Sequence, residues 1–400
     1  MNARSGVLGT ELAAADAQMF WLSAAIPNDQ FLIYGFAGEP AAGALDQVRS
    51  RAEAQPEFAL RVEQGGGYGY PHWAPAPISD DQFVVHPDGV GVGGDFGGTA
   101  GLGQLDATTM TWRVHYYPGG VLIVQICHAL ADGTGASSLA AALLGRPGQL
   151  PGTVAQPRGS FLGATIRAAR THRDAPQPPA ERRLLSINAA PSGPPVLRCV
   201  LVPRERLRGP TVTVGALCAI GGALGGYLRA RGEDPVGLGA EVPLANPWKS
   251  NARNNFRNVS IGIYPECDAP DRAALIAADL AAAAQRGAHR ATRAAAEALA
   301  ATPGVLVRWG ISRFDPAVRS ASVIGNTVVS SVNRGPADLR FGGRAVRYSA
   351  GFPALSPMQR LTHGVHGIGE TVVISVHADS AVIDIDHYLD LLARELQTAV

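Results

Sequence analysis

The residues best suited to chemistry lie in one short string, Cys127-His128-Ala129-Leu130-Ala131-Asp132-Gly133. The pKa of an imidazole is near neutrality, so His128 could take a proton at physiological pH and return it later, a role worth roughly 10²- to 10⁴-fold in rate. Asp132 could neutralise an arginine or orient the loop, and Gly133 would let backbone or ligand pass closely. Because ten histidines give such a string chances to arise by accident, its context decides its weight.

The context is a predicted strand before the string and a predicted helix after it. Residues 111–117 and 121–127 are strand-like runs joined by Pro-Gly-Gly, which is typical of a hairpin. Residues 135–144 are rich in strong helix formers. A histidine in such a strand-to-helix loop has a fixed backbone behind it and a cleft in front, where a general base is useful.

Strand and helix patterns alternate through both halves of the chain. Four hundred residues exceed what one hydrophobic core usually organises, so we expect two domains. A stretch rich in proline, arginine and serine predicts a crossover at 151–192, between halves at 1–150 and 193–400. The fold class is therefore α/β, an α+β sandwich of mixed sheets flanked by helices. Other expected strands are 31–36, 196–202, 259–264, 323–332 and 371–376, and other expected helices are 41–54, 212–231, 271–302 and 385–398.

Composition excludes some classes of function. The chain has 34 basic and 33 acidic residues, so we expect neither a nucleic-acid partner nor an anionic membrane surface. The four cysteines are widely spaced without a Cys-x-x-Cys pair, which favours a reducing compartment. No secretory signal pattern opens the sequence, so we expect a cytoplasmic protein. Residues 211–228 are long and apolar enough to suggest a membrane span, but five glycines and a narrow apolar stripe favour a buried helix.

Other motifs are weaker. Gly89, Gly91 and Gly94 have the spacing of a dinucleotide fingerprint, but more glycines follow instead of a helix, so a loop is favoured. His363 and His366 have the spacing of two metal ligands on one turn. Zinc needs a third and usually a fourth ligand, and no matching pair exists elsewhere, so we predict no metal site. Neither a Gly-x-Ser-x-Gly elbow nor a phosphate-binding Gly-x-x-x-x-Gly-Lys loop is present, which argues against serine hydrolases and nucleotide triphosphatases.

The string resembles the His-His-x-x-x-Asp-Gly signature of acyltransferases with the chloramphenicol-acetyltransferase-like fold. These include peptide-synthetase condensation domains, plant acyltransferases and bacterial wax ester synthase/diacylglycerol acyltransferases. The last group looks closest, because its motif commonly reads His-His-Ala-Leu-Ala-Asp-Gly. Weaker similarities run along most of the chain: the opening Asp16-Ala17-Gln18-Met19-Phe20, the segment 56–62, the strand Trp112-Arg113-Val114, and residues 330–336, which are similar to a Ser-Asn-Val-Pro-Gly-Pro loop.

This resemblance implies two similar domains meeting at a solvent channel with His128 at its middle. An acyl thioester, on coenzyme A or on the phosphopantetheine of an acyl carrier protein, would be a co-substrate, and no cofactor would be permanently bound. His128 would take the proton of a small-molecule hydroxyl or amine acceptor and then protonate the leaving thiolate. The resemblance also implies a structural Asp132, in a buried ion pair with Arg257 or Arg253.

Three departures from the family pattern matter. Cys127 replaces the first histidine, which is the less critical of the two. Ser331 stands where asparagine is usual, in a loop with one extra residue, so oxyanion stabilisation would depend on Ser331 or Asn333. The arginine that follows the family's Val-Pro element is missing from residues 242–248, so the substrate or the reaction type can differ.

The favoured hypothesis is an acyltransferase of bacterial secondary metabolism or lipid modification. A second hypothesis keeps the fold and makes the protein a cyclase, isomerase or lyase that uses His128 without an acyl donor. A third is a non-catalytic carrier-protein or metabolite binder. Fold does not choose among them. The sequence does not name the acyl chain, the acceptor, the carrier or the oligomeric state.

Overall fold

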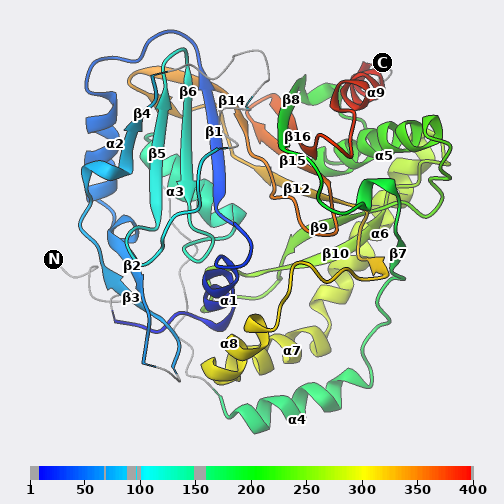
Figure 1. The fold of residues 1–400 in the computed structure, drawn as a ribbon, viewed down its shortest axis with the longest axis horizontal. Coiled ribbons are helices and arrows are strands. Elements are labelled where there is room, and N and C mark those ends of the chain that lie inside the picture. Colours follow the sequence, from blue (N-terminus) through cyan, green and yellow to red (C-terminus); the bar gives the residue numbers. More distant parts are fainter. Residues whose placement is uncertain (1–8, 67–68, 88–95, 97–100, 148–158, 398–400) are drawn as a thin grey trace.

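The computed structural model describes residues 9–66, 69–87, 96, 101–147 and 159–397. Its centre is two six-stranded sheets that lie side by side, each with helices packed on it (Figure 1). The predicted sandwich of two mixed sheets flanked by helices is therefore confirmed. The glycines at 89, 91 and 94 lie outside the described residues.

The first sheet has the order β13-β14-β1-β6-β5-β4. Helices α2 (Ala44–Glu53) and α3 (Gly133–Leu143) contribute to the core on one of its faces. The expected hairpin is present, because β5 and β6 pair antiparallel across Pro118-Gly119-Gly120, with positive φ at both glycines. The strands are β1 (Gln30–Phe36), β4 (Phe83–Val85), β5 (Trp112–Tyr117), β6 (Val121–Ile126), β13 (Arg340–Phe341) and β14 (Arg344–Ala350).

The second sheet has the order β10-β9-β12-β15-β16-β8. Helices α5 (Val212–Ala230), α6 (Ala269–Ala288) and α9 (Ile385–Gln397) share a hydrophobic core with it. Its strands are β8 (Pro195–Pro203), β9 (Gly239–Ala245), β10 (Phe256–Gly262), β12 (Thr327–Asn333), β15 (Leu361–Ile368) and β16 (Thr371–Asp379). The two-stranded sheets are β2 (Leu60–Glu63) with β3 (His72–Pro75), and β7 (Arg182–Arg183) with β11 (Ser322–Val323).

Helix α5 is the single described helix that is long and apolar enough to cross a membrane. In the structure, 72% of its apolar window is buried. Leu217, Ile220 and Leu224 of this helix have no more than 1% of their surface exposed, within the core of the second half. The helix packs as the buried core helix that its narrow apolar stripe predicts.

The prediction of one long helix over residues 271–302 is wrong, because the structure has two helices there. The chain forms α6 and then α7 (Arg290–Ala301), separated at His289, whose backbone is extended (φ −67°, ψ 142°). His289 caps α7, because its side chain accepts a hydrogen bond from the N–H of Ala291. Helix α4 (Phe161–His172) packs on α7, and α8 (Gly304–Ser312) packs on α1 (Ala14–Leu22). These smaller helices lie below the two sheets in Figure 1.

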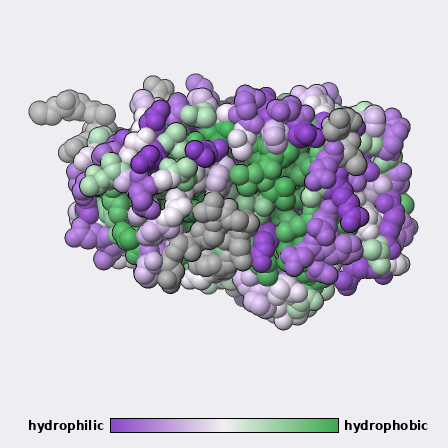
Figure 2. Space-filling model, turned by 90° about the horizontal axis from the view of Figure 1, so that it is seen from above, coloured by the Kyte–Doolittle hydropathy of each residue, from purple (hydrophilic) through white to green (hydrophobic). Residues whose placement is uncertain are grey.

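The C-terminal half contributes a strand to the first sheet. β14 belongs to the C-terminal part of the sequence, yet it pairs antiparallel with β1 at the side of the first sheet. Apolar residues of both sheets then meet between the halves, including Ile33 and Ile123 from the first and Leu197 and Val373 from the second. The view from above shows apolar surface gathered near the middle of the molecule, with hydrophilic surface on both sides (Figure 2). The residue limits of the two halves stay a prediction.

Candidate active site

His128 lies just beyond the C-terminal end of β6, in the loop that leads to α3. All six residues of β6 are buried, and the strand pairs with β1 on one side and β5 on the other, so the backbone before His128 is held at the centre of its sheet. The side chain itself is only partly buried. Its ring centroid lies 5.9 Å from that of Phe256 on β10. The histidine therefore stands at the junction of the two halves.

One asparagine from the second half fixes the histidine ring. His128 Nδ1 lies 2.8 Å from Oδ1 of Asn254. At the other end of the amide, Nδ2 donates to the carbonyl of His128 (2.8 Å) and to Oδ1 of Asp16 (2.9 Å). Because both amide protons go to oxygen acceptors, Oδ1 accepts from His128, and the proton of the neutral ring sits on Nδ1. Nε2 then carries the lone pair that a general base needs.

Asp16, on α1, is the buried carboxylate behind this asparagine. It is 1% exposed and also accepts hydrogen bonds from the backbone N–H groups of Arg253 (3.0 Å) and Asn254 (2.8 Å). Burial raises the pKa of Asp16 to about 6, although its hydrogen bonds and the charge of Arg253 act in the opposite direction. At neutral pH the ionised carboxylate therefore holds a loop of the second half against the first.

Burial lowers the pKa of His128 below its ordinary value. Hydrogen bonds with its own carbonyl and with Asn254, and the charge of Asp132, partly offset that effect. The imidazole is consequently neutral at pH 7, which is the form that can accept a proton.

Asp132 acts as the N-cap of α3. Its Oδ1 accepts hydrogen bonds from the backbone N–H groups of Thr134 (3.1 Å) and Gly135 (2.9 Å). Oδ2 lies 3.4 Å from the backbone nitrogen of Asn255, a weaker contact with the second half. Asp132 thus orients the loop after His128, one of the two roles considered for it.

The expected ion pair between Asp132 and Arg257 does not form. Arg257 instead donates from Nη1 to the carbonyl of Ala245 and from Nη2 to that of Ala283, both at 3.0 Å. The guanidinium lies against α6. A Cβ on Gly287 would overlap it, so only a glycine at this position gives Arg257 enough space.

Arg253, the other candidate, does not form the pair either. Its carbonyl accepts from the backbone N–H of Asp132 at 3.4 Å, while its guanidinium lies over the ring of Trp73 (5.3 Å). Asp16 therefore makes the stronger carboxylate contacts between the two halves, and Asp132 makes only the longer one to Asn255. The partners of Asp16 are backbone and amide N–H groups rather than a guanidinium.

The two suggested oxyanion donors have other partners. Ser331 Oγ shares a hydrogen bond with Thr213 Oγ1 on α5 (2.8 Å), and Asn333 Oδ1 accepts from the N–H of Gly335 (2.9 Å). The structure does not bring either side chain to His128.

The residue of β12 that reaches the loop after His128 is Val332, one position before Asn333. A Cβ on Gly133 would lie 3.4 Å from Val332 Cγ2 and 3.8 Å from Oε1 of Gln30. Gln30 also donates to the carbonyl of Ala131 (2.6 Å). The close approach predicted at Gly133 is thus made by two side chains, Gln30 of the first half and Val332 of the second.

Cys127, which replaces the first histidine of the signature, is a core residue. It is 1% exposed, and burial raises the pKa of its thiol to about 12. Since the thiolate is the reactive form of cysteine, Cys127 is inert at neutral pH.

The two histidines with metal-like spacing lie on a strand, β15, so residues three apart face opposite sides. His363 lies between Thr327 Oγ1 (3.0 Å) and the hydroxyl of Tyr388 (2.7 Å), and burial lowers its pKa to about 3. In the described ranges, no group of three or more His, Cys, Asp or Glu side chains is placed to hold a metal ion.

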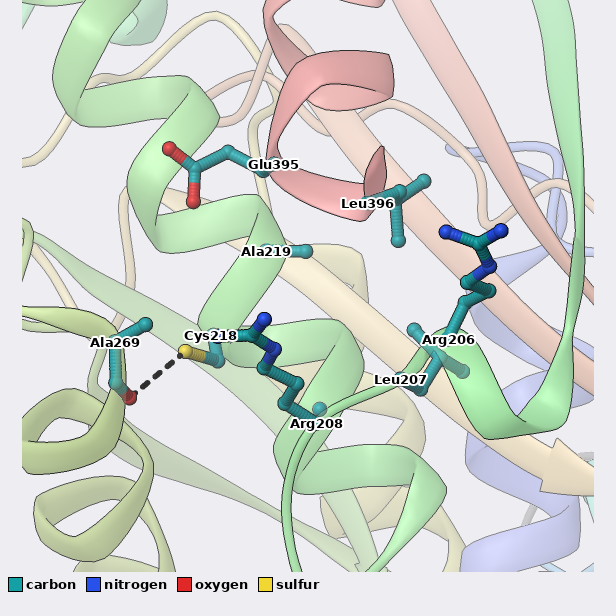
Figure 3. A pocket seen from close by; sticks show the side chains of 9 residues that line it. Arg206, Leu207, Arg208, Cys218, Ala219, Ala269, Glu395 and Leu396 are labelled. Atoms are coloured by element: carbon teal, nitrogen blue, oxygen red, sulfur yellow. Dashed lines mark hydrogen bonds between the residues drawn. The ribbon is translucent and has the colours of Figure 1, made fainter. Parts of the chain in front are cut away.

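A small pocket in the second half is separate from His128. Cys218 lies in it, with its Sγ 3.4 Å from the carbonyl of Ala269, and burial raises the pKa of this thiol (Figure 3). No residue of the His128 loop lines this pocket, so we assign it no catalytic role. The lining is Arg206, Leu207, Arg208, Gly215, Cys218, Ala219, Ala269, Glu395 and Leu396.

Asp16 and Asn254 carry weak local signals. Asp16 is a lone acid in an otherwise apolar stretch, and Asn254 lies in a polar loop rich in asparagine and arginine. They are 238 residues apart, and folding brings them together beside His128. A carboxylate isolated in an apolar helix pattern is the signal that could have pointed to Asp16, because burial of a charge requires partners.

Comparisons with known proteins bear on the fold and on the C-terminal part of the sequence. Residues 258–399 match the family model described as the WS/DGAT C-terminal domain. No curated protein matches the sequence. Among solved structures, a wax ester synthase/diacylglycerol acyltransferase from Marinobacter aquaeolei VT8 is similar, with a TM-score of 0.62 and 17% identity over 98% of each chain.

Two further similar structures are a condensation domain and a polyketide synthase associated protein. A starter condensation domain of rhizomide synthetase in complex with C8-CoA has a TM-score of 0.59 and 13% identity, over 98% of this chain and 94% of that one. Polyketide synthase associated protein 5 from Mycobacterium tuberculosis has a TM-score of 0.55 and 16% identity, over 98% of both chains. The C-terminal part of the chain thus matches the WS/DGAT family model, and the whole chain shares its fold with a wax ester synthase/diacylglycerol acyltransferase and a condensation domain.

Proposed function

We propose that this protein is an acyltransferase that moves an acyl group from a thioester to a hydroxyl or amine, with His128 as the general base. The observation that carries the proposal is the orientation of Asn254. Its amide is fixed by Asp16 and by the carbonyl of His128, so its Oδ1 accepts a hydrogen bond from Nδ1–H of His128 and Nε2 is left unprotonated. A lowered pKa keeps the ring neutral and ready to accept a proton at pH 7.

The proposed reaction balances without a covalent enzyme intermediate. Nε2 of His128 takes the proton from the acceptor O–H or N–H while that atom bonds to the thioester carbonyl carbon. The resulting tetrahedral intermediate collapses, the C–S bond breaks, and the imidazolium returns its proton to the leaving thiolate. One imidazole is sufficient for both transfers, so the buried, protonated thiol of Cys127 need not take part.

The acyl donor is proposed to be a coenzyme A or carrier-protein thioester. Fold relatives are named as a wax ester synthase/diacylglycerol acyltransferase and as a condensation domain in complex with C8-CoA. The position of His128 between the two halves, with its side chain partly exposed, is compatible with a donor and an acceptor that arrive from different sides. No permanently bound cofactor is needed by this chemistry.

The test is mass-spectrometric turnover of a panel of acyl-coenzyme A and carrier-bound thioesters with mixed alcohols and amines. We expect release of the thiol together with an acylated acceptor of matching mass. His128→Ala should lose both products, whereas His172→Ala, which alters an exposed histidine on α4, should keep them. Conversion of an acceptor without thiol release would support a donor-free cyclase, isomerase or lyase and would contradict acyl transfer.

A further inference from the structure

A second buried polar cluster lies at the junction of the two halves, around Arg334. This residue follows the end of β12 and belongs to the loop that is one residue longer than the family pattern. Only 6% of it is exposed. Its backbone is held by hydrogen bonds of its N–H to the carbonyl of Gly367 (2.7 Å) and of its carbonyl to Nη1 of Arg146 (2.7 Å). The guanidinium is therefore directed into the protein by a fixed loop.

Arg334 differs from the other buried arginines because no carboxylate among the described residues pairs with it. Arg360 pairs with Asp379 at 2.8 Å, and Arg272 lies 3.5 Å from a carboxylate oxygen of Glu395. The guanidinium of Arg334 donates from Nη1 to the hydroxyl of Ser137. Its Nε has no hydrogen-bond partner among the described residues. A buried cation without a counter-charge is costly, so its environment should offer compensation.

The neighbouring side chains add three more polar atoms. Tyr34 on β1 and Ser349 on β14 are paired in register, both 0% exposed, and neither hydroxyl has a hydrogen-bond partner of acceptable geometry among the described residues. His366 on β15 is 4% exposed, and its Nδ1 also lacks a partner there. The backbone places these groups close together. The N–H of Arg334 donates to the carbonyl of Gly367, the residue after His366, and a Cβ on Gly351, two residues beyond Ser349, would lie 3.0 Å from Cε1 of the His366 ring.

We propose that Arg334, Tyr34, Ser349 and His366 form a binding site for one small monovalent anion, a halide ion or a carboxylate group. The guanidinium N–H and the two hydroxyls are donors that can converge on such a ligand. One anionic charge would neutralise one guanidinium. Full burial disfavours a larger or divalent anion, because desolvation of a second charge would have no compensating cation.

The proposed anion would act as a bridge between the halves. Tyr34 and Ser349 belong to the first sheet, and Ser137, the hydrogen-bond partner of Arg334, belongs to α3. Arg334 and His366 belong to the end of β12 and to β15 of the second sheet. Because the ligand binds a site that only the folded protein offers, it should stabilise the native state by mass action. This inference does not depend on the acyl-transfer reaction.

Thermal unfolding in chloride and acetate tests the proposal. The purified full-length protein is dialysed into sodium sulfate, and sodium chloride or sodium acetate then replaces it at constant ionic strength. We expect a rise in Tm of about 1.5 to 2 °C for each tenfold increase in the effective anion above its Kd. Arg334→Met should abolish this concentration dependence, and Tyr34→Phe, which retains the cation, should weaken it. Arg347→Met, on the exposed side of β14, is the matched control and should respond like the wild type.

Bromide soaking of crystals gives a direct second readout. An anomalous peak beside Arg334 that is absent in Arg334→Met supports a halide site. A Tm response to acetate without a response to chloride, and without a bromide peak, supports a carboxylate ligand. Equal salt responses of the wild type, Arg334→Met and Arg347→Met, together with no bromide peak, would overturn the proposal and leave the cluster as a hydrated polar pocket.

Discussion

The His128 site and the Arg334 cluster are two polar regions at the same junction, and they differ in how they are satisfied. Around His128, the carboxylate of Asp16 and the amide of Asn254 pair their hydrogen-bonding atoms with protein groups. Around Arg334, four buried polar atoms lack partners among the described residues. The closed network holds one imidazole in one tautomer, whereas the open cluster leaves donors available for a ligand. A satisfied network suits positioning, and an unsatisfied one suits binding.

The largest expected effect comes from removal of the imidazole. His128→Ala should lower kcat/KM by about 10²- to 10⁴-fold, the range for loss of a general base. The circular dichroism spectrum should match that of the wild type, and the Tm should fall by a few degrees at most, because the variant loses the hydrogen bond of Nδ1 to the buried Asn254. The comparison is His172→Ala, with unchanged kcat/KM. An equally active His128→Ala protein would rule out the general-base assignment.

The pH dependence of kcat/KM should show the next largest effect. Only the neutral imidazole accepts a proton, so activity should be present above the pKa of His128 and fall about tenfold per pH unit below it. Burial lowers this pKa, so the midpoint should lie below the usual value of about 6.5. Asp16, with its pKa near 6, titrates in the same range, so the profile should be repeated with Asp16→Asn. An acid limb that disappears in that variant would assign the titration to Asp16 instead.

Removal of the two aspartates should separate their roles. Asp16→Ala leaves two backbone N–H groups and an amide N–H without their acceptor, and each buried unsatisfied group costs about 1–3 kcal/mol. Asp132→Ala removes an N-cap and should cost about 0.5–2 kcal/mol. Denaturant unfolding measures both free energies. A larger loss in Asp132→Ala than in Asp16→Ala would contradict the assignment of Asp16 as the carboxylate with the stronger contacts between the halves.

Asp16→Ala should also lower kcat more than it raises KM. The asparagine then loses one of the two acceptors that orient it, so the imidazole spends less time in the productive tautomer. Asp16→Glu offers a carboxylate at a different reach and tests partial rescue. A fall in stability with unchanged kcat would show that Asp16 has a structural role only.

The smallest expected effect is that of Arg257→Met. Its guanidinium contacts carbonyls of β9 and α6 and does not reach Asp132. We expect kcat/KM to remain within error of the wild type and the Tm to fall slightly. A large loss of activity would revive the ion pair that the family resemblance implies.

Features that depend on residues close in sequence were predictable, and features that depend on contacts between distant residues were not. The hairpin before His128 and the helix after it were predictable, because turn residues, strand runs and helix formers act over a few positions. The break at His289 was not predicted, because alanine-rich stretches lie on both sides of it and suggest one helix. Strand β14 could not be assigned to the first sheet, because pairing with β1 links residues more than 300 positions apart.

The candidate site divides in the same way. His128 and Asp132 share one short motif, and the structure places both in the loop expected for them. The predicted ion pair of Asp132 with Arg257 was wrong. The Arg257 side chain points toward space left by Gly287 on α6, a helix that is distant in sequence. Asn254 and Asp16 gain their roles through contacts across more than 100 residues, which no local pattern encodes.

The most direct test of the central claim is ¹⁵N nuclear magnetic resonance of the histidine imidazoles at pH 7.5, with His128→Ala used to assign the signal. The Asp16–Asn254 network predicts a neutral His128 ring with the proton on Nδ1 and an unprotonated Nε2. In Asn254→Ala, which removes the acceptor, the same signal should move toward a mixture of tautomers. A wild-type ring that is protonated on Nε2, or on both nitrogens, would contradict the claim that this network presents His128 as the base.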